Sequence, residues 1–428
     1  MTEQEIAGLG PAFASYLGRY RGCFLQKRTA AHFDTYCRGL LSDLPRKSVE
    51  PIALEAGTAV RTLQEFLVTA RWDHGQARDT LQRHLAAALA ATAADATGTV
   101  GVIDETSCRK WGEHTPGVQR QYLGCVGKLD NGIVTVHVGV AKGRFQALLD
   151  ADLYLPQSWD QDRPRCRAAG IPDDVRYRPK WRIALDQLLR PGGNGVTFDW
   201  LVFDEGYGAA VPFLEALSLV GQRFVAEVPV NFAVRDRAGG PARRADERLT
   251  GADARGGRRY RLAQRTAPDS VWRAATAAGW VAGRRHTLIV AVNEATAAVK
   301  YFLTNATGEP LARVPAVAFR RWTVEHGFRL GKQEAGLLDY EGRDYTALVR
   351  HLILALVVLG FVATHTERLR GEKAAGDGGA GMPGVEPALR GGVPPAPGHR
   401  GAAPHQCGDP LPPAAQRASH EVSQETAA

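Results

Sequence analysis

Two acidic residues stand at matching places in two separate apolar segments of the chain. Asp104 ends the run VGVID and Asp204 ends the run WLVFD, and a glutamate follows each of them. If each run is a buried strand, its end brings a carboxylate to one edge of a sheet, and carboxylate oxygens suit Mg²⁺ or Mn²⁺. The alternative is that each aspartate only caps a following turn or helix. Because the arrangement occurs twice, it favours a metal site. Glu105 and Glu205 should point to the opposite side of their strands and are weaker candidates.

A third acidic residue lies much later in the chain, in the segment RWTVEHGFRLGK. At ~100° per residue, Arg321, Glu325 and Lys332 fall within ~40° of one another on a helix. One helix face would therefore carry a carboxylate flanked by two cations. The alternative is an ordinary surface ion pair, since arginine and glutamate four residues apart commonly pair on an exposed face.

Helices are predicted to precede the first of these acidic segments. Residues 1–97 place aromatic and leucine side chains at steps of three and four, as in amphipathic helices. After Pro45, two short helical patterns are separated by Gly57 and Thr58, which is compatible with a helix-turn-helix. Direct contact with DNA and plain helical packing both remain open for this segment.

Strands are predicted from residue 98 onward, where the periodicity changes. Segments 99–105, 120–128 and 133–141 are rich in β-branched residues, and Asp130-Asn131-Gly132 predicts a hairpin turn between the last two. A helix is expected before the strand that ends at Asp204. Further strands are expected in 221–308, and helices in 309–334 and 344–369.

The end of the chain and its composition bound the class of protein. Residues 371–428 contain too few large apolar side chains to fold and are predicted to be disordered. The longest apolar run, 352–363, is shorter than the ~20 residues that cross a bilayer, so we expect a buried helix, no membrane and a soluble, intracellular protein. The six cysteines form no C-x-x-C pair, which argues against a zinc site or a disulfide scaffold. A net charge of +8 favours a polyanionic partner.

Several of these segments together resemble a known family. VIDET, LVFDEGYG and RWTVEHGFRLGKQEAGLLDY are similar to the three catalytic blocks of bacterial insertion-sequence transposases of the Asp-Asp-Glu (DDE) type. The segments YLPQSW and GVQRQYLGCVGKLDNG resemble members of the insertion sequence 701 family in particular. The third block of several such enzymes reads Tyr-x2-Arg-x3-Glu-x6-Lys, and here Ala318 occupies the tyrosine position.

The resemblance implies an α/β fold with a ribonuclease H-like catalytic core, a β-rich insertion and an α-helical N-terminal domain. The implied boundaries are 1–97 for the helical DNA-binding domain, 98–220 for the first part of the core, 221–308 for the insertion, 309–370 for the C-terminal core helices and 371–428 for the tail.

The resemblance also implies an activity. Asp104, Asp204 and Glu325 would bind two Mg²⁺ ions, or Mn²⁺ in their place, to cut transposon ends and join them to target DNA. The partners implied are double-stranded DNA and a second copy of the chain, in the bacterial cytoplasm at the nucleoid. The alternative is a catalytically inactive DNA-binding protein derived from a transposase. The residues expected to contact DNA are Arg321, Lys332, Arg329, Arg46 and Lys47.

Overall fold

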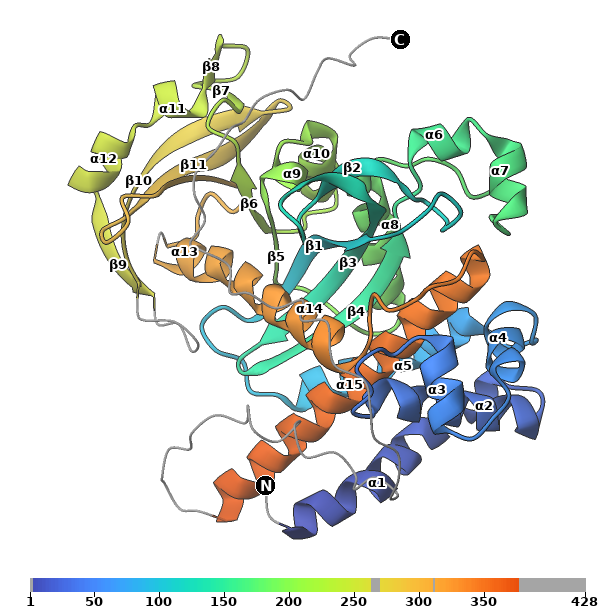
Figure 1. Cartoon of the computed structure of the whole chain (residues 1–428). Helices are drawn as coiled ribbons and strands as arrows, with labels where there is room; N and C mark the ends of the chain where they lie inside the picture. The colour runs from blue at the N-terminus through green and yellow to red at the C-terminus, as the bar shows by residue number, and fades with distance from the viewer. Residues whose placement is uncertain (1–2, 263–269, 311, 377–428) are drawn as a thin grey trace. The chain divides into compact units, whose positions relative to one another are not determined.

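The computed structural model describes residues 3–262, 270–310 and 312–376 (Figure 1). The predicted tail therefore lies almost wholly outside the described residues. At its start, however, the last helix continues to Gly376 rather than ending at residue 369.

Helices fill the first part of the chain, as the apolar spacing predicts. Phe13, Leu17 and Tyr20 are buried, and Asp73 caps the fifth helix by accepting a hydrogen bond from the backbone N–H of Gln76. The two patterns around Gly57 form α3 and α4. The elements are α1 (Glu3–Gly18), η1 (Arg21–Cys23), α2 (Lys27–Leu41), α3 (Val49–Glu55), α4 (Val60–Val68) and α5 (His74–Ala91).

A sheet that runs through the middle of the described chain carries the predicted acidic segments. β1 pairs antiparallel with β3 and parallel with β5, and β5 pairs parallel with β6. β4 pairs with β3 on the edge away from β1. These strands are β1 (Thr99–Arg109), β2 (Gln119–Leu123), β3 (Lys128–Lys142), β4 (Phe145–Leu153), β5 (Trp200–Phe203) and β6 (Phe224–Val228).

The hairpin turn predicted at Asp130-Asn131-Gly132 is wrong. These three residues lie within β3 and pair with β2, and the chain turns at 124–127, where Gly127 has a φ of +66°. The chain therefore turns at Gly127, whose positive φ suits a glycine, although Asn131-Gly132 is the stronger turn signal in the sequence. The strand β4 was not anticipated, because its alternation is interrupted by three acidic or small residues.

Short helices connect β4 to β6. Trp159 is fully buried, and its Nε1 donates a hydrogen bond of 2.7 Å to the carbonyl of Val118, so this tryptophan anchors its loop. α8 packs on β3 and β4. The helices are α6 (Gln157–Asp160), α7 (Arg163–Ala168), α8 (Lys180–Gly193), α9 (Glu205–Gly208) and α10 (Val211–Leu219).

The strands of the predicted insertion continue the same sheet rather than forming a separate one. The order is β2-β3-β1-β5-β6-β12-β11-β10-β7-β8, with β9 paired to β10. The sheet is mostly antiparallel beyond β6, and β12 joins it there through pairs such as Phe302 with Glu227. The remaining elements are β7 (Ala233–Arg235), β8 (Ala242–Arg244), α11 (Ala245–Arg248), α12 (Gly251–Gly256), β9 (Arg258–Leu262), β10 (Ser270–Val281), β11 (Arg284–Asn293) and β12 (Val299–Thr304).

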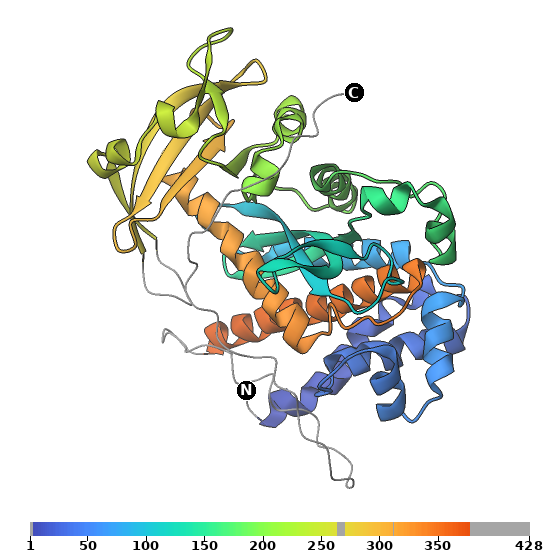
Figure 2. The ribbon, with the colours of Figure 1, turned by 45° about the horizontal axis from the view of Figure 1, so that its top comes forward.

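Two short helical segments lead into the helix that carries Glu325. α13 (Arg313–Ala318) and η2 (Phe319–Arg321) lead into α14 (Trp322–Glu334), so the single helix predicted for 309–334 is interrupted before Glu325. Figure 2 shows α14 lying across the strands of the central sheet, and α14 contacts β1, β3 and β4.

The last helix, α15 (Tyr345–Gly376), packs against β4 and against the N-terminal helices α2, α4 and α5. Its length and apolar composition would allow it to cross a membrane, but 83% of its most apolar window is buried inside the protein. Helices from both ends of the chain thus share one core with the sheet.

Candidate active site

The first two predicted acids lie side by side on neighbouring strands. The last parallel pair of β1 and β5 joins Ile103 to Phe203, so Asp104 and Asp204 are the next residues on each strand. Adjacent strands are ~4.8 Å apart. β1 itself runs on to Arg109, so Asp104 lies within a strand, whereas Asp204 follows the end of β5. Asp104 and Asp204 therefore lie side by side in the sheet.

Asp204 also has the capping role that was considered as the alternative. It is the N-cap of α9, and its Oδ1 accepts hydrogen bonds from the backbone N–H groups of Gly206 (3.0 Å) and Tyr207 (3.3 Å). These two donors hold the carboxyl group in one orientation at the end of the strand. Asp204 can therefore cap α9 and also present its carboxylate at the candidate site.

The glutamates that follow the two aspartates differ from each other. Glu105 points to the other side of the sheet, as predicted, and its Oε1 lies 2.7 Å from Lys180 Nζ of α8. For Glu205 the prediction is wrong, because β5 ends at Phe203 and the strand alternation stops there. Burial and the negative charges of Glu227 and Asp204 raise the pKa of Glu205, which places its carboxylate near theirs.

Arg321 joins the third acid to the first. Its Nη1 donates a hydrogen bond of 3.0 Å to Asp104 Oδ2, and its Nη2 lies 3.6 Å from Glu325 Oε1. Glu325 is in the first turn of α14 and its side chain is 55% exposed, whereas that of Asp104 is 11% exposed. One guanidinium thus bridges a buried carboxylate of the sheet and an accessible carboxylate of the helix.

The electrostatics of the site show that it holds excess negative charge. Burial, and next the neighbouring charge of Asp204, raise the pKa of Asp104 to about 7, although Arg321 opposes the shift. Burial lowers the pKa of Arg321, but Asp104, Glu227 and Glu325 more than compensate, so this pKa lies above its ordinary value. The carboxylates therefore need a positive charge between them, and Arg321 supplies it.

Lys332 approaches the same region from the later part of α14. Burial lowers the pKa of Lys332, and the nearby thiols of Cys125 and Cys108 and the carboxylate of Asp104 act in the opposite direction. These partners place the lysine beside β1, on the face of the sheet that carries Asp104. The predicted Arg321, Glu325 and Lys332 are therefore near Asp104 together.

The other three predicted DNA contacts lie in different environments. Arg329 is exposed on α14 and shares a hydrogen bond of 3.0 Å with His326 Nδ1. Arg46 is exposed and lies 3.0 Å from Glu341. Lys47 is buried, and its Nζ donates a hydrogen bond of 2.6 Å to the carbonyl of Glu334 at the end of α14.

The position of Lys47 differs from what a phosphate contact requires. Its backbone N–H also donates to Asp339 Oδ2 (2.8 Å), so both ends of the residue are engaged inside the protein. A DNA contact at Lys47 stays a prediction, and the structure gives the ammonium an internal partner instead. The spacing of basic residues in the sequence carries no signal of this burial.

Ala318, at the place of the family tyrosine, is buried at the end of α13. The next residue, Phe319, packs against Trp272 and Phe302 of the insertion strands, with ring centroids 5.0 and 6.4 Å apart. An aromatic ring therefore stands near this position, but it faces the strands β10 and β12.

The donor atoms fit a hard divalent cation, while their present arrangement is that of an ion pair. Within the described ranges, no group of three or more His, Cys, Asp or Glu side chains is arranged to hold a metal ion. Asp104, Asp204 and Glu325 supply only carboxylate oxygens, which Mg²⁺ prefers. The guanidinium of Arg321 stands where a cation bound by Asp104 and Glu325 would have its charge.

Glu227 is an acidic residue of this region that the sequence analysis missed. It follows Ala226, which pairs with Phe203, so it continues the row of Asp104 and Asp204 onto β6. Its Oε1 lies 2.5 Å from Lys300 Nζ of β12. The signal available was a lone glutamate in the apolar strand FVAEV, which is weak without knowledge of the strand order.

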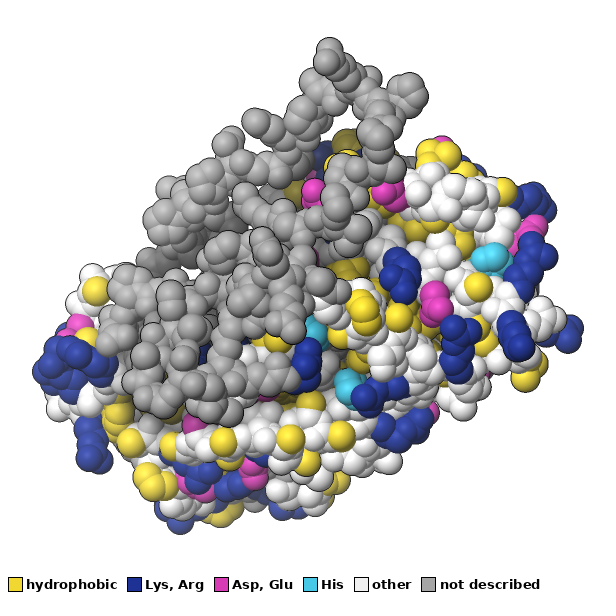
Figure 3. Space-filling model, turned by 90° about the horizontal axis from the view of Figure 1, so that it is seen from below, with side chains coloured by type: hydrophobic (Ala, Val, Ile, Leu, Met, Phe, Trp, Pro, Cys, Tyr) yellow, Lys and Arg dark blue, Asp and Glu magenta, His cyan; other side chains and the backbone are white. Residues whose placement is uncertain are grey.

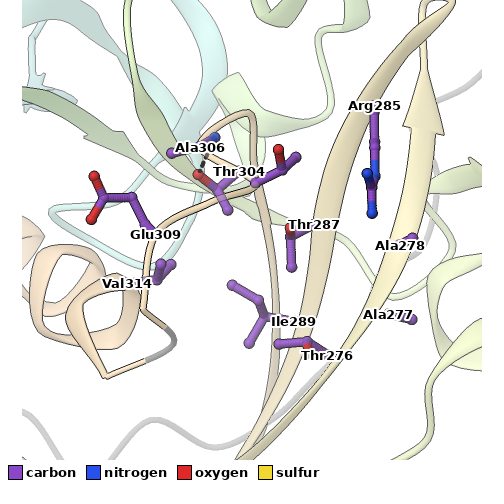
Figure 4. A pocket seen from close by; sticks show the side chains of 11 residues that line it. Thr276, Ala277, Ala278, Arg285, Thr287, Ile289, Thr304, Ala306, Glu309 and Val314 are labelled. Carbon is purple, nitrogen blue, oxygen red and sulfur yellow. Dashed lines mark hydrogen bonds between the residues drawn. The ribbon is translucent and has the colours of Figure 1, made fainter.

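The insertion strands carry a separate pocket of about 240 Å³ (Figure 4). It lies between β10, β11, β12 and α13, and it contains none of the three predicted acids. Threonine side chains from each strand line it together with Arg285 and Glu309. The lining residues are Thr276, Ala277, Ala278, Arg285, Thr287, Ile289, Thr304, Ala306, Thr307, Glu309 and Val314.

The surface is basic where it can be seen. On the face shown in Figure 3, Lys and Arg side chains are more frequent than Asp and Glu side chains outside the grey atoms. This agrees with the excess of basic residues in the whole chain. Such a surface attracts polyanions.

Comparisons with known proteins show which proteins this chain resembles. A family model described as DDE superfamily endonuclease matches residues 19–297, a range that includes Asp104 and Asp204 and ends before Glu325. The probable transposase for insertion sequence element IS701 of Microchaete diplosiphon is 31% identical over 222 residues, which are 51% of this chain and 54% of that protein. The chain thus matches about half the length of this curated relative.

Among solved structures, the NurA nuclease from Sulfolobus solfataricus is similar over 71% of this chain and 93% of its own, at 10% identity and a TM-score of 0.25. The family match, which covers more than half of the chain, and the IS701 relative both bear out the resemblance seen in the sequence. The chain belongs to the DDE superfamily endonucleases.

Proposed function

We propose that this protein is a DNA transposase that cuts transposon ends by metal-dependent hydrolysis and joins them to target DNA by transesterification. The observation that carries the proposal is the approach of Asp104, Asp204 and Glu325 to one place, with Arg321 bridging two of them. The order β4-β3-β1-β5-β6, with β1, β5 and β6 parallel, supports a ribonuclease H-like core.

Asp104 and Asp204 would hold two Mg²⁺ ions from the sheet, and Glu325 would hold them from α14, with Mn²⁺ able to replace Mg²⁺. When bound, such a pair of ions activates the attacking oxygen and stabilises the leaving oxygen of a phosphodiester. The backbone N–H groups of Gly206 and Tyr207 keep the Asp204 carboxylate oriented toward the site.

Basic residues on and near α14 would hold the DNA backbone. Arg321 and Lys332 lie beside the acids and would contact phosphates next to the cut. A guanidinium has five N–H donors, so Arg321 can keep a carboxylate partner while it binds a phosphate. Arg329 and Arg46 are exposed and would contact DNA farther from the cut.

The test compares two neutral substitutions of adjacent residues on β1. Asp104→Asn should abolish Mg²⁺-dependent nicking of end-repeat DNA and leave binding to that DNA nearly unchanged. Glu105→Gln is the matched control, because Glu105 faces Lys180 on the other side of the sheet; it should retain nicking. Equal nicking by Asp104→Asn and the wild type would refute the metal site.

The second candidate is a catalytically inactive DNA-binding protein derived from a transposase. The ion pairs of Arg321 favour it, because they occupy two of the three carboxylates. Binding of end-repeat DNA by the wild type without any nicking in Mg²⁺ or Mn²⁺ would support this candidate.

The partners and the cellular place follow from the same proposal. Double-stranded DNA carrying the end repeats and target DNA would be the substrates. A homodimer would pair two transposon ends, and the protein would act at the nucleoid in the bacterial cytoplasm. Sedimentation of the protein with end-repeat DNA would test the dimer, since a single copy per pair of ends would contradict it.

A further inference from the structure

Glu227 is held at the edge of the candidate active site by the sheet itself. Parallel pairing joins Ile103 to Phe203 and Phe203 to Ala226. The next residues, Asp104, Asp204 and Glu227, therefore form a row across three strands, and side chains in one row point to the same face. The glutamate is thus on the face that carries the first two acids.

The position of Glu227 is fixed from two sides. Lys300 of β12 lies 2.5 Å from its Oε1, and the Glu227 side chain is only 17% exposed. On the other side, α9 packs on β6 so closely that a Cβ on Gly208 would collide with the carbonyl oxygen of Glu227. The same short helix begins at Asp204. The spacing between Asp204 and Glu227 is therefore set by backbone packing.

Glu227 also acts electrostatically on Arg321. Its carboxylate is, after that of Asp104, the strongest influence that raises the pKa of Arg321, and it precedes Glu325 in this respect. Four carboxylates, those of Asp104, Glu227, Glu325 and Asp204, thus raise the pKa of Arg321. Arg321 now contacts two of them, Asp104 and Glu325.

A guanidinium and divalent cations cannot share the same carboxylates without strong repulsion. Cations bound by Asp104 and Glu325 would therefore displace Arg321 from its present contacts. The Arg321 side chain is mostly buried, with 18% of it exposed. If it loses its partners it therefore needs another negative group, because an unpaired charge away from water is costly. Among the four carboxylates that most raise the pKa of Arg321, Glu227 is the one that the proposed metal site does not use.

We propose that Glu227 is a positioning residue, which receives the guanidinium of Arg321 when Asp104 and Glu325 bind divalent cations. Lys300 keeps the Glu227 carboxylate in place for this exchange. The inference rests on the proposed metal site, and it assigns Arg321 two positions, one between the acids and one beside β6.

The test measures Mn²⁺ binding to the full chain by titration calorimetry without DNA, so it does not depend on activity. Glu227→Gln should weaken binding about tenfold, because Arg321 then has no second partner. Arg321→Met should strengthen binding severalfold, since it removes the competing cation. In the Arg321→Met background, Glu227→Gln should change binding less than twofold.

The control separates this exchange from a simple loss of negative charge. Glu205 is another carboxylate close to Asp204 and Glu227, and it is not among the carboxylates that most raise the pKa of Arg321. Glu205→Gln should therefore weaken Mn²⁺ binding by nearly the same factor with and without Arg321. Glu227→Gln combined with Lys300→Met leaves no unpaired ammonium and should behave as Glu227→Gln alone.

Two results would overturn the inference while leaving the metal site in place. One is an equal effect of Glu227→Gln in the wild type and in Arg321→Met, which would mean that Glu227 acts on the metal ions directly, through its charge or as a ligand. The other is no effect of Glu227→Gln in the wild-type background. If the wild type binds no Mn²⁺, or Asp104→Asn binds it as well as the wild type, the proposed function fails and the inference fails with it.

Discussion

At the scale of single residues, Asp104 is a buried carboxyl group whose surroundings disfavour its negative charge. It lies beside Asp204 and forms an ion pair with Arg321. Burial and Asp204 raise its pKa to about 7, against an ordinary value of about 3.9. The ionised form of Asp104 is thus disfavoured in the folded protein until more positive charge arrives.

This shift predicts a pH dependence of stability. A folded-state pKa above the unfolded one means that the contribution of Asp104 is fully present below about pH 3.9 and is lost as the pH rises through about 7. In EDTA, the melting temperature of the wild type should therefore fall by several degrees more between pH 5 and 8 than that of Asp104→Asn. Differential scanning fluorimetry measures both.

Saturating Mg²⁺ provides the control for this comparison. The cation binds the ionised carboxylate, so it should remove most of the difference in pH dependence between the two proteins. Parallel pH profiles of the wild type and Asp104→Asn in EDTA would show that Asp104 keeps an ordinary pKa.

The sequence predicted three acids that the structure brings near one another, but not all of their partners. Asp104, Asp204 and Glu325 were recognisable because the first two end apolar strands and the third lies in a basic helix. The ion pair between Arg321 and Asp104 was not predictable, since it joins residues 217 positions apart. Glu227 was missed for the same reason, because its place depends on which strands are neighbours.

At the scale of elements, the short helix α9 sets the position of Asp204. Asp204 caps the helix, and Gly208 ends it against the carbonyl of Glu227 on β6. The motif DEGYG thus combines an acid with a glycine that allows close packing. Periodicity predicted the strand before this motif, but the need for glycine at its end depends on a contact with another strand.

Gly208→Ala should therefore be destabilising. The added methyl group would meet the backbone oxygen of Glu227, which cannot move as a flexible side chain would. Overpacking of this kind costs about 1–3 kcal/mol. Urea denaturation measures the free energy of unfolding, and nicking of end-repeat DNA should fall as well because Asp204 is displaced.

The matched control is Gly192→Ala in α8, where no atom lies within 4 Å of the added Cβ. It should leave the free energy of unfolding unchanged or raise it slightly, because alanine favours the helix. A similar effect of both substitutions would contradict the packing argument for Gly208.

Sequence periodicity predicted most elements but not the register of the sheet. The helices α8, α14 and α15 and the strands β1, β5, β6 and β11 lie where their patterns indicated. The turn before β3 and the strand β4 did not, because packing in the whole sheet decides between competing turns and short alternating segments.

At the scale of the whole molecule, buried ion pairs join helices from the beginning of the chain to the sheet. Asp150 of β4 is fully buried and pairs with Arg78 of α5 at 3.0 Å and with Arg190 of α8. Burial of Arg78 is nearly as complete, with 9% of its side chain exposed. The three elements are therefore fixed to one another through a single carboxylate.

Asp150→Asn should destabilise the protein strongly, by about 3–5 kcal/mol, because it leaves the buried charge of Arg78 without its counter-charge. Asp186→Asn is the control, since Asp186 pairs with Arg178 and Arg182 in a more exposed place and should cost less than about 1 kcal/mol. Equal unfolding free energies for the two variants would show that the ion pairs of Asp150 do not stabilise the packing of these elements.

Lys47 and Arg46 allow a second comparison, between a structural and a DNA-binding role. Lys47→Met should lower the free energy of unfolding by about 1.5–3 kcal/mol, the range for a hydrogen bond from a charged group. Its effect on DNA affinity should be small. Arg46→Met should leave stability unchanged and weaken binding to end-repeat DNA.

Fluorescence anisotropy with labelled end-repeat DNA measures affinity, and urea denaturation measures stability. If Lys47→Met weakens DNA binding while its stability equals that of the wild type, Lys47 contacts phosphate as the family resemblance implied. The sequence could not decide this, because adjacent basic residues in a loop give no indication of which one turns inward.

The link from Lys47 to the end of α14 has a mechanical consequence. Arg46 is exposed to solvent, and the next residue, Lys47, is hydrogen-bonded to the end of the helix that carries Glu325. A DNA duplex that bound this loop and shifted it would also shift α14, and with it Glu325 at the other end of the helix. If the protein binds a transposon end as proposed, docking of that end and movement of Glu325 would then be coupled.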